Sequence, residues 1–278
     1  MHATGRDFFV EGGAGRGLRA RLLPAVHVGP FNARTRIELT QVTLALPRLP
    51  AAFAGFRIAL VSDLHYGRSV QAAFIRKVAR IVVEQAPDLV LLAGDWVEHF
   101  APRFVDLAEL LSEVVRRFPT CAVPGNHDYF GRPEPLWQAL REAGVDILVN
   151  RHRLIRRGDA AIAVVGVDDV DGGHPDIRQA VAGIGAGTFT ILASHSPDAA
   201  DLVPDDVAID VLLAGHTHGG QIQFFGWAPM TYTRNRRYLQ GLYQQGRFPL
   251  YVCRGLGATF LPIRIGSPSE LPIITLCR

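Results

Sequence analysis

Two histidines separated by one residue follow directly after an apolar run in the last third of the chain. The run covers residues 211–214, and beyond Gly215 it continues into His216 and His218. Side chains alternate in an extended segment, so the two imidazoles point to the same side of the chain. Both can face one point just beyond the end of a buried strand, where a metal ion could bind. Taken alone, the pair is equally typical of a hydrogen-bonded turn.

Four further apolar runs upstream end in the same way, in aspartate, asparagine or histidine. The donors at these five ends are Asp63, His65, Asp95, Asn126, His127, Asp128, His195, His216 and His218. Ligands of open α/β sheets bind beyond the carboxyl ends of the strands, so we expect these donors to share one crevice. A catalytic zinc ion needs only about three protein ligands. Two ions that share a carboxylate fit this set better, as in two-metal sites that hydrolyse phosphate esters.

The donors contain nitrogen and oxygen but no sulfur. This composition favours Mn, Fe or Zn over a thiolate site, and among these we favour manganese. The acidic loop with Asp168, Asp169 and Asp171 could form an extra metal site, but an aspartate-rich turn at a strand end is the favoured interpretation.

Strands and helices alternate in the first half of the chain, and strands prevail in the second. Hydrophobic periodicity predicts strands at residues 37–46, 57–61, 88–93, 121–123 and 146–149, and helices over about 70–82, 104–118 and 135–143. The second half should contain a hairpin (152–156 and 161–167) and strands at 189–193, 211–214, 221–225, 239–243, 250–253 and 273–276. With no internal repeat or linker, we expect one α/β domain over residues 36–278, after a flexible leader at 1–35.

Composition describes an ordered globular protein. Of 278 residues, 48% are hydrophobic and 20% charged, and the net charge of +3 is too small to indicate a nucleic-acid partner. The three cysteines have no CxxC spacing, which favours free thiols in a reducing compartment. No apolar stretch reaches the roughly 18 residues of a membrane span, and residues 1–17 lack the layout of a signal peptide. We therefore expect a cytoplasmic protein.

The five blocks together resemble the signature of the calcineurin-like metallophosphoesterases, in order over about residues 57–220. This resemblance implies a four-layer α/β/β/α sandwich with a dinuclear metal centre. By position, it implies that one ion is held by Asp63, His65 and His218, the other by Asn126, His195 and His216, with Asp95 as the bridge. His127 matches the catalytic histidine of the family, and Asp128 is placed to orient it.

The C-terminal third carries a narrower resemblance. Residues 219–221, 241–243, 251–257 and 262–264 resemble a bacterial phosphodiesterase branch often described as transmembrane metallophosphoesterases. Part of that branch is described as having UDP-2,3-diacylglucosamine diphosphatase activity, which is a step of lipid A synthesis. Its members commonly begin with a hydrophobic anchor or an export signal, and this sequence departs from that pattern.

These observations predict hydrolysis of a phosphodiester or diphosphate bond by a hydroxide that bridges two metal ions. His127, when protonated, would stabilise the developing charge or protonate the leaving group. A nuclease or nucleotide phosphodiesterase of the same superfamily is the alternative, and a non-catalytic scaffold a weaker one because no ligand is missing. Nucleic acid is not the expected partner.

The segment after His218 bears on the substrate. Residues 219–232 are rich in aromatics, and Arg234, Arg236 and Arg237 follow. Either the aromatics close the core as a hairpin, or they form an apolar lip with a basic rim. The second interpretation predicts a lipid-linked phosphate ester, such as UDP-2,3-diacylglucosamine, and peripheral contact with the inner face of the membrane. A second basic cluster, Arg151, Arg153, Arg156 and Arg157, is a solvated face or a contact for anionic head groups.

Overall fold

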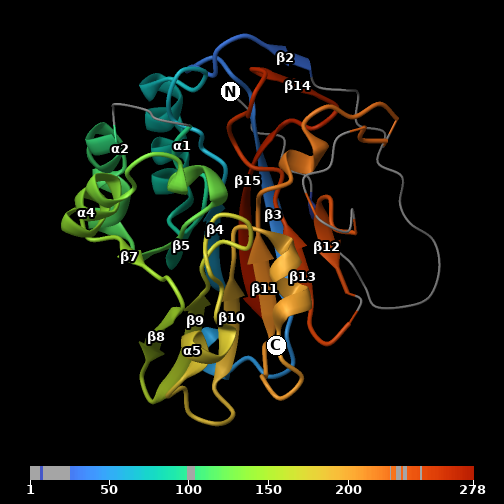
Figure 1. Ribbon diagram of the computed structural model, residues 1–278. Coiled ribbons are helices and arrows are strands. Elements are labelled where there is room, and N and C mark those ends of the chain that lie inside the picture. Colours follow the sequence, from blue (N-terminus) through green and yellow to red (C-terminus); the bar gives the residue numbers. More distant parts are fainter. Residues whose placement is uncertain are drawn as a thin grey trace.

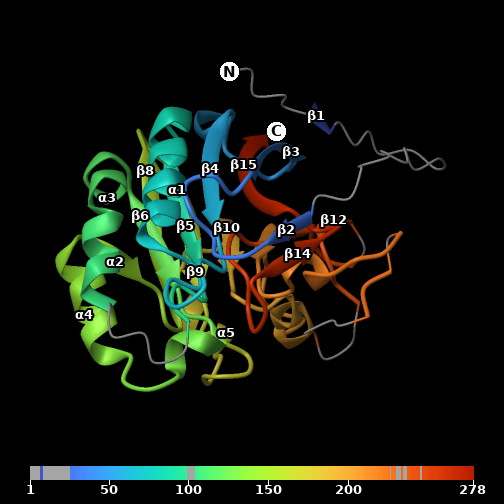
Figure 2. The same ribbon diagram turned by 90° about the horizontal axis from the view of Figure 1, so that it is seen from above.

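Two β-sheets pack face to face and are covered by helices on their outer sides (Figures 1 and 2). The computed structural model describes residues 7–8, 26–98, 104–225, 227–229, 233, 237–244 and 246–278. The first sheet has seven strands in the order β1-β3-β15-β4-β5-β6-β7. These are β1 (Asp7–Phe8), β3 (Ile37–Ala45), β15 (Ser269–Cys277), β4 (Phe56–Val61), β5 (Leu89–Ala93), β6 (Thr120–Val123) and β7 (Asp146–Ile147).

The second sheet has six strands in the order β12-β13-β11-β10-β9-β8. Its members are β12 (Gly241–Tyr243), β13 (Leu250–Val252), β11 (Val211–Ala214), β10 (Phe189–Ala193), β9 (Ala160–Gly166) and β8 (Arg151–Arg157). Strands β4, β5, β6 and β7 are parallel to one another, as are β9, β10, β11 and β13. A small separate sheet pairs β2 (Val26–Val28) with β14 (Ile263–Ile265).

The helices form an outer layer on each side. Figure 2 shows α1 (Ala72–Gln85), α2 (Phe104–Leu110), α3 (Ser112–Arg117) and α4 (Glu134–Glu142) on one side of the first sheet. The outer face of the second sheet packs on α5 (Ile177–Val181) and the 3-10 helix η3 (Pro197–Leu202). Shorter 3-10 turns are η1 (Ala51–Phe53), η2 (Asn126–Tyr129) and η4 (His218–Gly220).

Side chains alternate between the two faces of each central strand, and this alternation builds the two apolar cores on either side of the first sheet. In β5, Val90 and Leu92 belong to the core under helices α1–α4, whereas Leu89 and Leu91 belong to the core between the sheets. Since both faces of these central strands are buried, their sequences are continuously apolar. The structure confirms the predicted four-layer α/β/β/α sandwich in a single domain.

Several predicted elements differ in detail from the observed ones. The helix expected over residues 104–118 is divided at Leu111 into α2 and α3. The strand expected at 221–225 is not formed, because only Ile222 and Phe224 make isolated bridges there. The terminal strand is longer than residues 273–276, because it pairs with β3 from Ser269 to Cys277. Helix α5 and the β2–β14 pair carry too few periodic residues to have been predicted.

The predicted leader at residues 1–35 lies mostly outside the described part of the chain. Its described C-terminal portion, residues 26–35, contains β2 and the fully buried Phe31. The Phe31 ring contacts Phe74 of α1 edge-on, at 5.5 Å between centroids. Residues 26–35 therefore pack on the fold, through contacts that no periodicity in this short segment could indicate.

The core between the sheets should dominate stability. Leu91 lies fully buried there, so Leu91→Ala should leave a cavity and lower the free energy of unfolding by about 2–5 kcal/mol. Leu154 of β8 is 38% exposed, and Leu154→Ala should change the same quantity by no more than about 0.5 kcal/mol. Urea denaturation measures both. Equal losses in the two variants would contradict this assignment of the core.

Candidate metal centre

The donors predicted from the sequence lie in loops at the carboxyl ends of β4, β5, β6, β10 and β11. Five of them have left-handed backbone conformations: Asp63 (φ 55°), His65 (φ 47°), Asp95 (φ 51°), His216 (φ 72°) and His218 (φ 53°). A left-handed conformation costs a non-glycine residue about 1–2 kcal/mol. Such strain is retained where the surroundings enforce it, typically at functional sites. The loops are therefore held in shape by the rigid strands that precede them.

The first donor cluster contains Asp63, His65 and His218. One ligand-type atom from each lies within 4.8 Å of the others, and all three side chains are buried. Nε2 of His218 is 3.0 Å from Nε2 of His65 and 3.5 Å from Oδ1 of Asp63. These residues come from both sheets, since Asp63 and His65 follow β4 and His218 follows β11.

The second cluster contains Asp95, His195 and His216, again within 4.8 Å of one another. Nε2 of His195 lies 3.2 Å from Oδ2 of Asp95 and 3.1 Å from Nδ1 of His216. The same Oδ2 atom is 3.5 Å from Nε2 of His65, which belongs to the first cluster. Asp95 is thus the residue at which the two clusters meet.

Burial keeps the histidines of the first cluster neutral. It lowers the pKa of His65 to about 3 and that of His218 well below its usual value. For His195 burial acts in the same direction, but the charge and hydrogen bond of Asp95 raise its pKa well above the usual value. Nδ1 of His195 donates to the carbonyl of Ala93 at 2.8 Å, which orients Nε2 toward Asp95. Such a contact is typical of histidines that ligate metals.

Asn126, which follows β6, lies on a loop that packs against the second cluster. Gly125 packs so closely that a Cβ atom there would be 2.3 Å from Oδ1 of Asp95 and 2.9 Å from Cδ2 of His195. Oδ1 of Asn126 and Oδ1 of Asp63 are buried and accept no hydrogen bond within the described part of the protein. Buried oxygens normally have partners. Two buried clusters of carboxylate, amide and imidazole donors with such oxygens fit a pair of divalent cations.

Asp128 accepts hydrogen bonds from three backbone N–H groups. Its Oδ1 accepts from the backbone N–H groups of Trp96 and Val97, at 2.8 and 3.3 Å, and its Oδ2 accepts from that of Gly125 at 2.9 Å. These contacts tie the loop after β5 to the loop after β6. Because Asp128 directly follows His127, these contacts also hold the backbone beside His127, and the orienting role of Asp128 stays a prediction. Burial and the nearby Asp95 raise the pKa of Asp128 well above its usual value.

His127 lies beside His65 and Asp95. Its ring meets that of His65 edge-on at 4.6 Å between centroids, and its backbone N–H donates to Oδ1 of Asp95 at 2.8 Å. Phe130 and Phe260 flank the same ring at 5.5 and 6.4 Å, and are 43% and 71% exposed. The sequence analysis missed both phenylalanines. Phe130 could have been noticed three residues after His127, whereas Phe260 comes from a distant loop without any motif.

The acidic loop after β9 forms the turn that was predicted. Oδ1 of Asp169 accepts from the backbone N–H groups of Asp171 and Gly172, at 2.9 and 2.6 Å. The loop also lies beside the second cluster, with Oδ2 of Asp171 at 3.8 Å from Nε2 of His216. Its acids therefore add negative charge next to His216, a location that the spacing of the motifs did not indicate.

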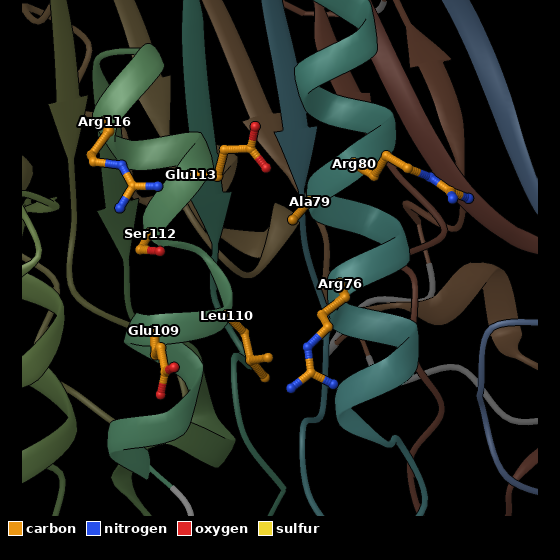
Figure 3. A pocket seen from close by; sticks show the side chains of 8 residues that line it. All are labelled: Arg76, Ala79, Arg80, Glu109, Leu110, Ser112, Glu113 and Arg116. Carbon is orange, nitrogen blue, oxygen red and sulfur yellow. The ribbon is translucent and has the colours of Figure 1, made fainter.

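A separate groove lies between α1 and helices α2 and α3 (Figure 3). Figure 3 shows its charged side chains, which have both signs: Arg76, Arg80, Glu109, Glu113 and Arg116. None of the predicted donors lines it, so this groove is distinct from the metal centre.

Buried carboxylates and imidazoles at the strand ends of an α/β sandwich define a metal-dependent hydrolase of phosphate esters. Comparison with known proteins agrees, since residues 56–220 match the model of the family described as calcineurin-like phosphoesterase. The chain belongs to this family and is a phosphoester hydrolase. The family implies two divalent metal ions, which agrees with the two donor clusters.

Three relatives illustrate the similarity. The metallophosphoesterase YkuE of Bacillus subtilis is 32% identical over 245 residues, covering 86% of this chain and 85% of its own. The phosphodiesterase YaeI of Escherichia coli is 30% identical over 80% of this chain and 83% of its own. A transmembrane protein with a metallophosphoesterase domain from Danio rerio is 30% identical over 89% of this chain but only 59% of its own length. Among the described residues of the present protein, no helix has the length and apolar character needed to cross a membrane.

The position of Asp95 between the clusters leads to a test. Asp95→Asn keeps the shape of the side chain but removes the negative charge that allows two cations to lie close together. We expect at most one ion per chain, and activity reduced by at least about a hundredfold. Elemental analysis of protein purified without chelator measures the ions. Two tightly bound ions with normal turnover in this variant would contradict a shared carboxylate.

Proposed function

We propose that this protein is a dinuclear metal-dependent phosphodiesterase or diphosphatase. In this proposal one ion is held by Asp63, His65 and His218, the other by Asn126, His195 and His216, and both by Asp95. The observation that carries the proposal is the position of Oδ2 of Asp95, at 3.5 Å from His65 and 3.2 Å from His195. Nitrogen and oxygen donors suit Mn, Fe or Zn, and we propose manganese.

Two divalent ions would polarise the phosphate oxygens and acidify a water that attacks phosphorus. The chain supplies the remaining functions. His127 is 6% exposed and its ring lies beside that of His65, where it can stabilise the developing charge or protonate the leaving oxygen. Its backbone N–H fixes Oδ1 of Asp95, and Phe130 and Phe260 limit the access of water to its ring.

An exposed apolar surface beside this site supports a lipid-linked substrate. It consists of Phe224, Phe225, Trp227, Phe260 and Leu261, which are 49%, 111%, 66%, 71% and 52% exposed. Gln221 joins its two segments by donating to the carbonyls of Thr259 and Leu261, at 3.0 and 3.1 Å. The described aromatics after His218, Phe224, Phe225 and Trp227, are therefore exposed and do not close the core. Because Phe260 flanks His127, the surface extends from the reaction site outward.

The substrate that we propose carries a phosphodiester or diphosphate and an apolar group, as UDP-2,3-diacylglucosamine does. Exposed Val26 and Val28 on β2 extend the apolar surface, since β2 pairs with β14 directly after Leu261. Buried apolar area of this kind supports peripheral attachment to the inner face of the membrane by a cytoplasmic protein. The Danio rerio relative, a transmembrane protein by name, is consistent with such a location.

The basic residues of β8 do not favour nucleic acid as the substrate. Arg151 and Arg153 lie 2.8 and 3.7 Å from the carboxylate of Asp146, and Arg157 pairs with Asp88. Of the arginines that follow the aromatic segment, Arg237 is 3.0 Å from Asp201, while Arg234 and Arg236 lie outside the described residues. The described arginines of both clusters are largely compensated by acids, which weakens them as a track for a phosphate backbone.

The role of His127 can be separated from metal binding. His127→Ala should lower turnover by about 10²–10⁴, because the proposed proton donor is lost, while metal content stays near that of the parent. The measurement pairs steady-state hydrolysis of a generic phosphodiester with elemental analysis. His127 also forms a donor group with His65 and Asp95 within 4.8 Å. Loss of metal together with activity would therefore make it a ligand and overturn the proposed role.

The apolar surface generates a substrate prediction. We expect UDP-2,3-diacylglucosamine to be hydrolysed with higher catalytic efficiency than its deacylated analogue or single-stranded DNA. Trp227→Ala should reduce efficiency on the acylated compound about tenfold and leave the deacylated one unchanged. Leu202, 42% exposed on η3, provides the matched control, and Leu202→Ala should change neither. Equal efficiency on both compounds, with no effect of Trp227→Ala, would remove the support for a lipid-linked substrate.

A further inference from the structure

Arg264 is a buried arginine whose hydrogen-bond partners carry no negative charge. Its side chain lies in β14 and is only 1% exposed. Nε donates to the carbonyl of Gly257 at 2.6 Å, and Nη1 to those of His218 and Ser267, both at 3.1 Å. Nη2 donates to the carbonyl of Arg254 at 2.8 Å and lies 2.9 Å from Nδ1 of His218. Four of the five N–H groups of the guanidinium thus donate to backbone carbonyls.

A cation in this place is unfavourable on electrostatic grounds. A guanidinium keeps its charge in proteins, so Arg264 is a buried cation at neutral pH. Removing a charge from water is unfavourable, and replacing buried charged groups by apolar residues is often neutral or stabilising. The charge also lies against a proposed ligand of a divalent cation, which it repels. The contribution of Arg264 should therefore lie in the positions of the groups that it holds by hydrogen bonds.

The hydrogen bonds of Arg264 join two loops that meet at the first donor cluster. One loop carries His218, and it continues through left-handed Gly219 and Gly220, with φ of 57° and 73°. Ser267 fastens the same loop, because its hydroxyl donates to the His218 carbonyl at 2.7 Å. A segment with several left-handed residues needs such external contacts to keep one conformation.

The second loop, residues 254–257, packs on Asp63. The N–H of Gly257 donates to the Asp63 carbonyl at 2.6 Å, and that of Leu256 to the Ser62 carbonyl at 3.0 Å. A Cβ atom at Gly255 would be 2.6 Å from Cβ of Asp63, which shows how closely this loop surrounds the carboxylate. Arg264 thus contacts His218 of the first cluster directly, and it also contacts the loop that packs on Asp63. In the second cluster, Oδ1 of Asp95 accepts from the N–H of His127, and Nδ1 of His195 donates to the carbonyl of Ala93.

We propose that Arg264, assisted by Ser267, is the positioning residue of the first metal site. It holds the backbone of the loop that carries His218, so that Nε2 of His218 faces Asp63 and His65, and it locks the loop that packs on Asp63. The inference rests on the proposed dinuclear centre and adds that the two metal sites depend on different supports. Lysine cannot replace arginine here, since a single ammonium cannot reach acceptors spread around a planar fork.

The test compares Arg264→Lys, Ser267→Ala and a control, Arg157→Lys, which alters a half-exposed arginine paired with Asp88. Mn²⁺ is the probe, and its binding is measured by titration calorimetry and by electron paramagnetic resonance. The parent should bind two ions and show the spectrum of a coupled pair. In Arg264→Lys one ion should bind at least about tenfold more weakly, leaving the spectrum of a single ion at limiting Mn²⁺. Ser267→Ala should weaken the same ion less, and the control should match the parent.

The outcomes separate this inference from the proposed function. Parent protein that binds fewer than two ions would contradict the dinuclear centre itself. A parent with two ions and a folded Arg264→Lys with unchanged affinity for both would overturn the role of Arg264 alone, as would equal weakening of both ions. Circular dichroism reports whether Arg264→Lys folds. If it does not, Ser267→Ala decides: selective weakening of one ion supports the inference, and unchanged binding overturns it.

Discussion

The carboxylate of Asp95 lies between a histidine of each sheet, and the rest of the site depends on this arrangement. His65 follows β4 of the first sheet and His195 follows β10 of the second, at 3.5 and 3.2 Å from the same oxygen. The strand ends of the two sheets must therefore come unusually close. Glycine makes this possible, because a Cβ atom at Gly94 would lie 2.5 Å from Nδ1 of His195, and one at Gly125 2.3 Å from Asp95.

The two packed sheets below the loops stabilise the conformation of the site. Five of the donors have left-handed backbones, and the buried Oδ1 atoms of Asp63 and Asn126 accept no hydrogen bond within the described part of the chain. Both features destabilise a folded chain. The apolar core between the sheets offsets these costs and holds the strand ends in place. Divalent cations would in turn give the buried oxygens of Asp63 and Asn126 their missing partners, so metal binding and folding should be coupled.

The sequence predicted the fold and the gathering of the donors because both depend on local patterns. Continuous apolar runs such as residues 89–93 are typical of strands buried on both faces, and a donor directly after each run must reach the same edge. Contacts made across the fold were beyond such reasoning. Phe260 beside His127, Arg264 beside His218 and the backbone contacts of Asp128 join segments whose spacing carries no signal. The strand expected at residues 221–225 failed for a related reason, since its aromatics face solvent instead of a core.

The central claim is that one carboxylate joins two cations. Anomalous diffraction from crystals of the Mn²⁺-loaded protein, recorded at the manganese absorption edge, tests it most directly. The account predicts two peaks about 3.5–4 Å apart, both within bonding distance of Asp95, with His65 and His218 at one and His195 and His216 at the other. A single peak, or a pair of peaks of which only one lies next to Asp95, would contradict it.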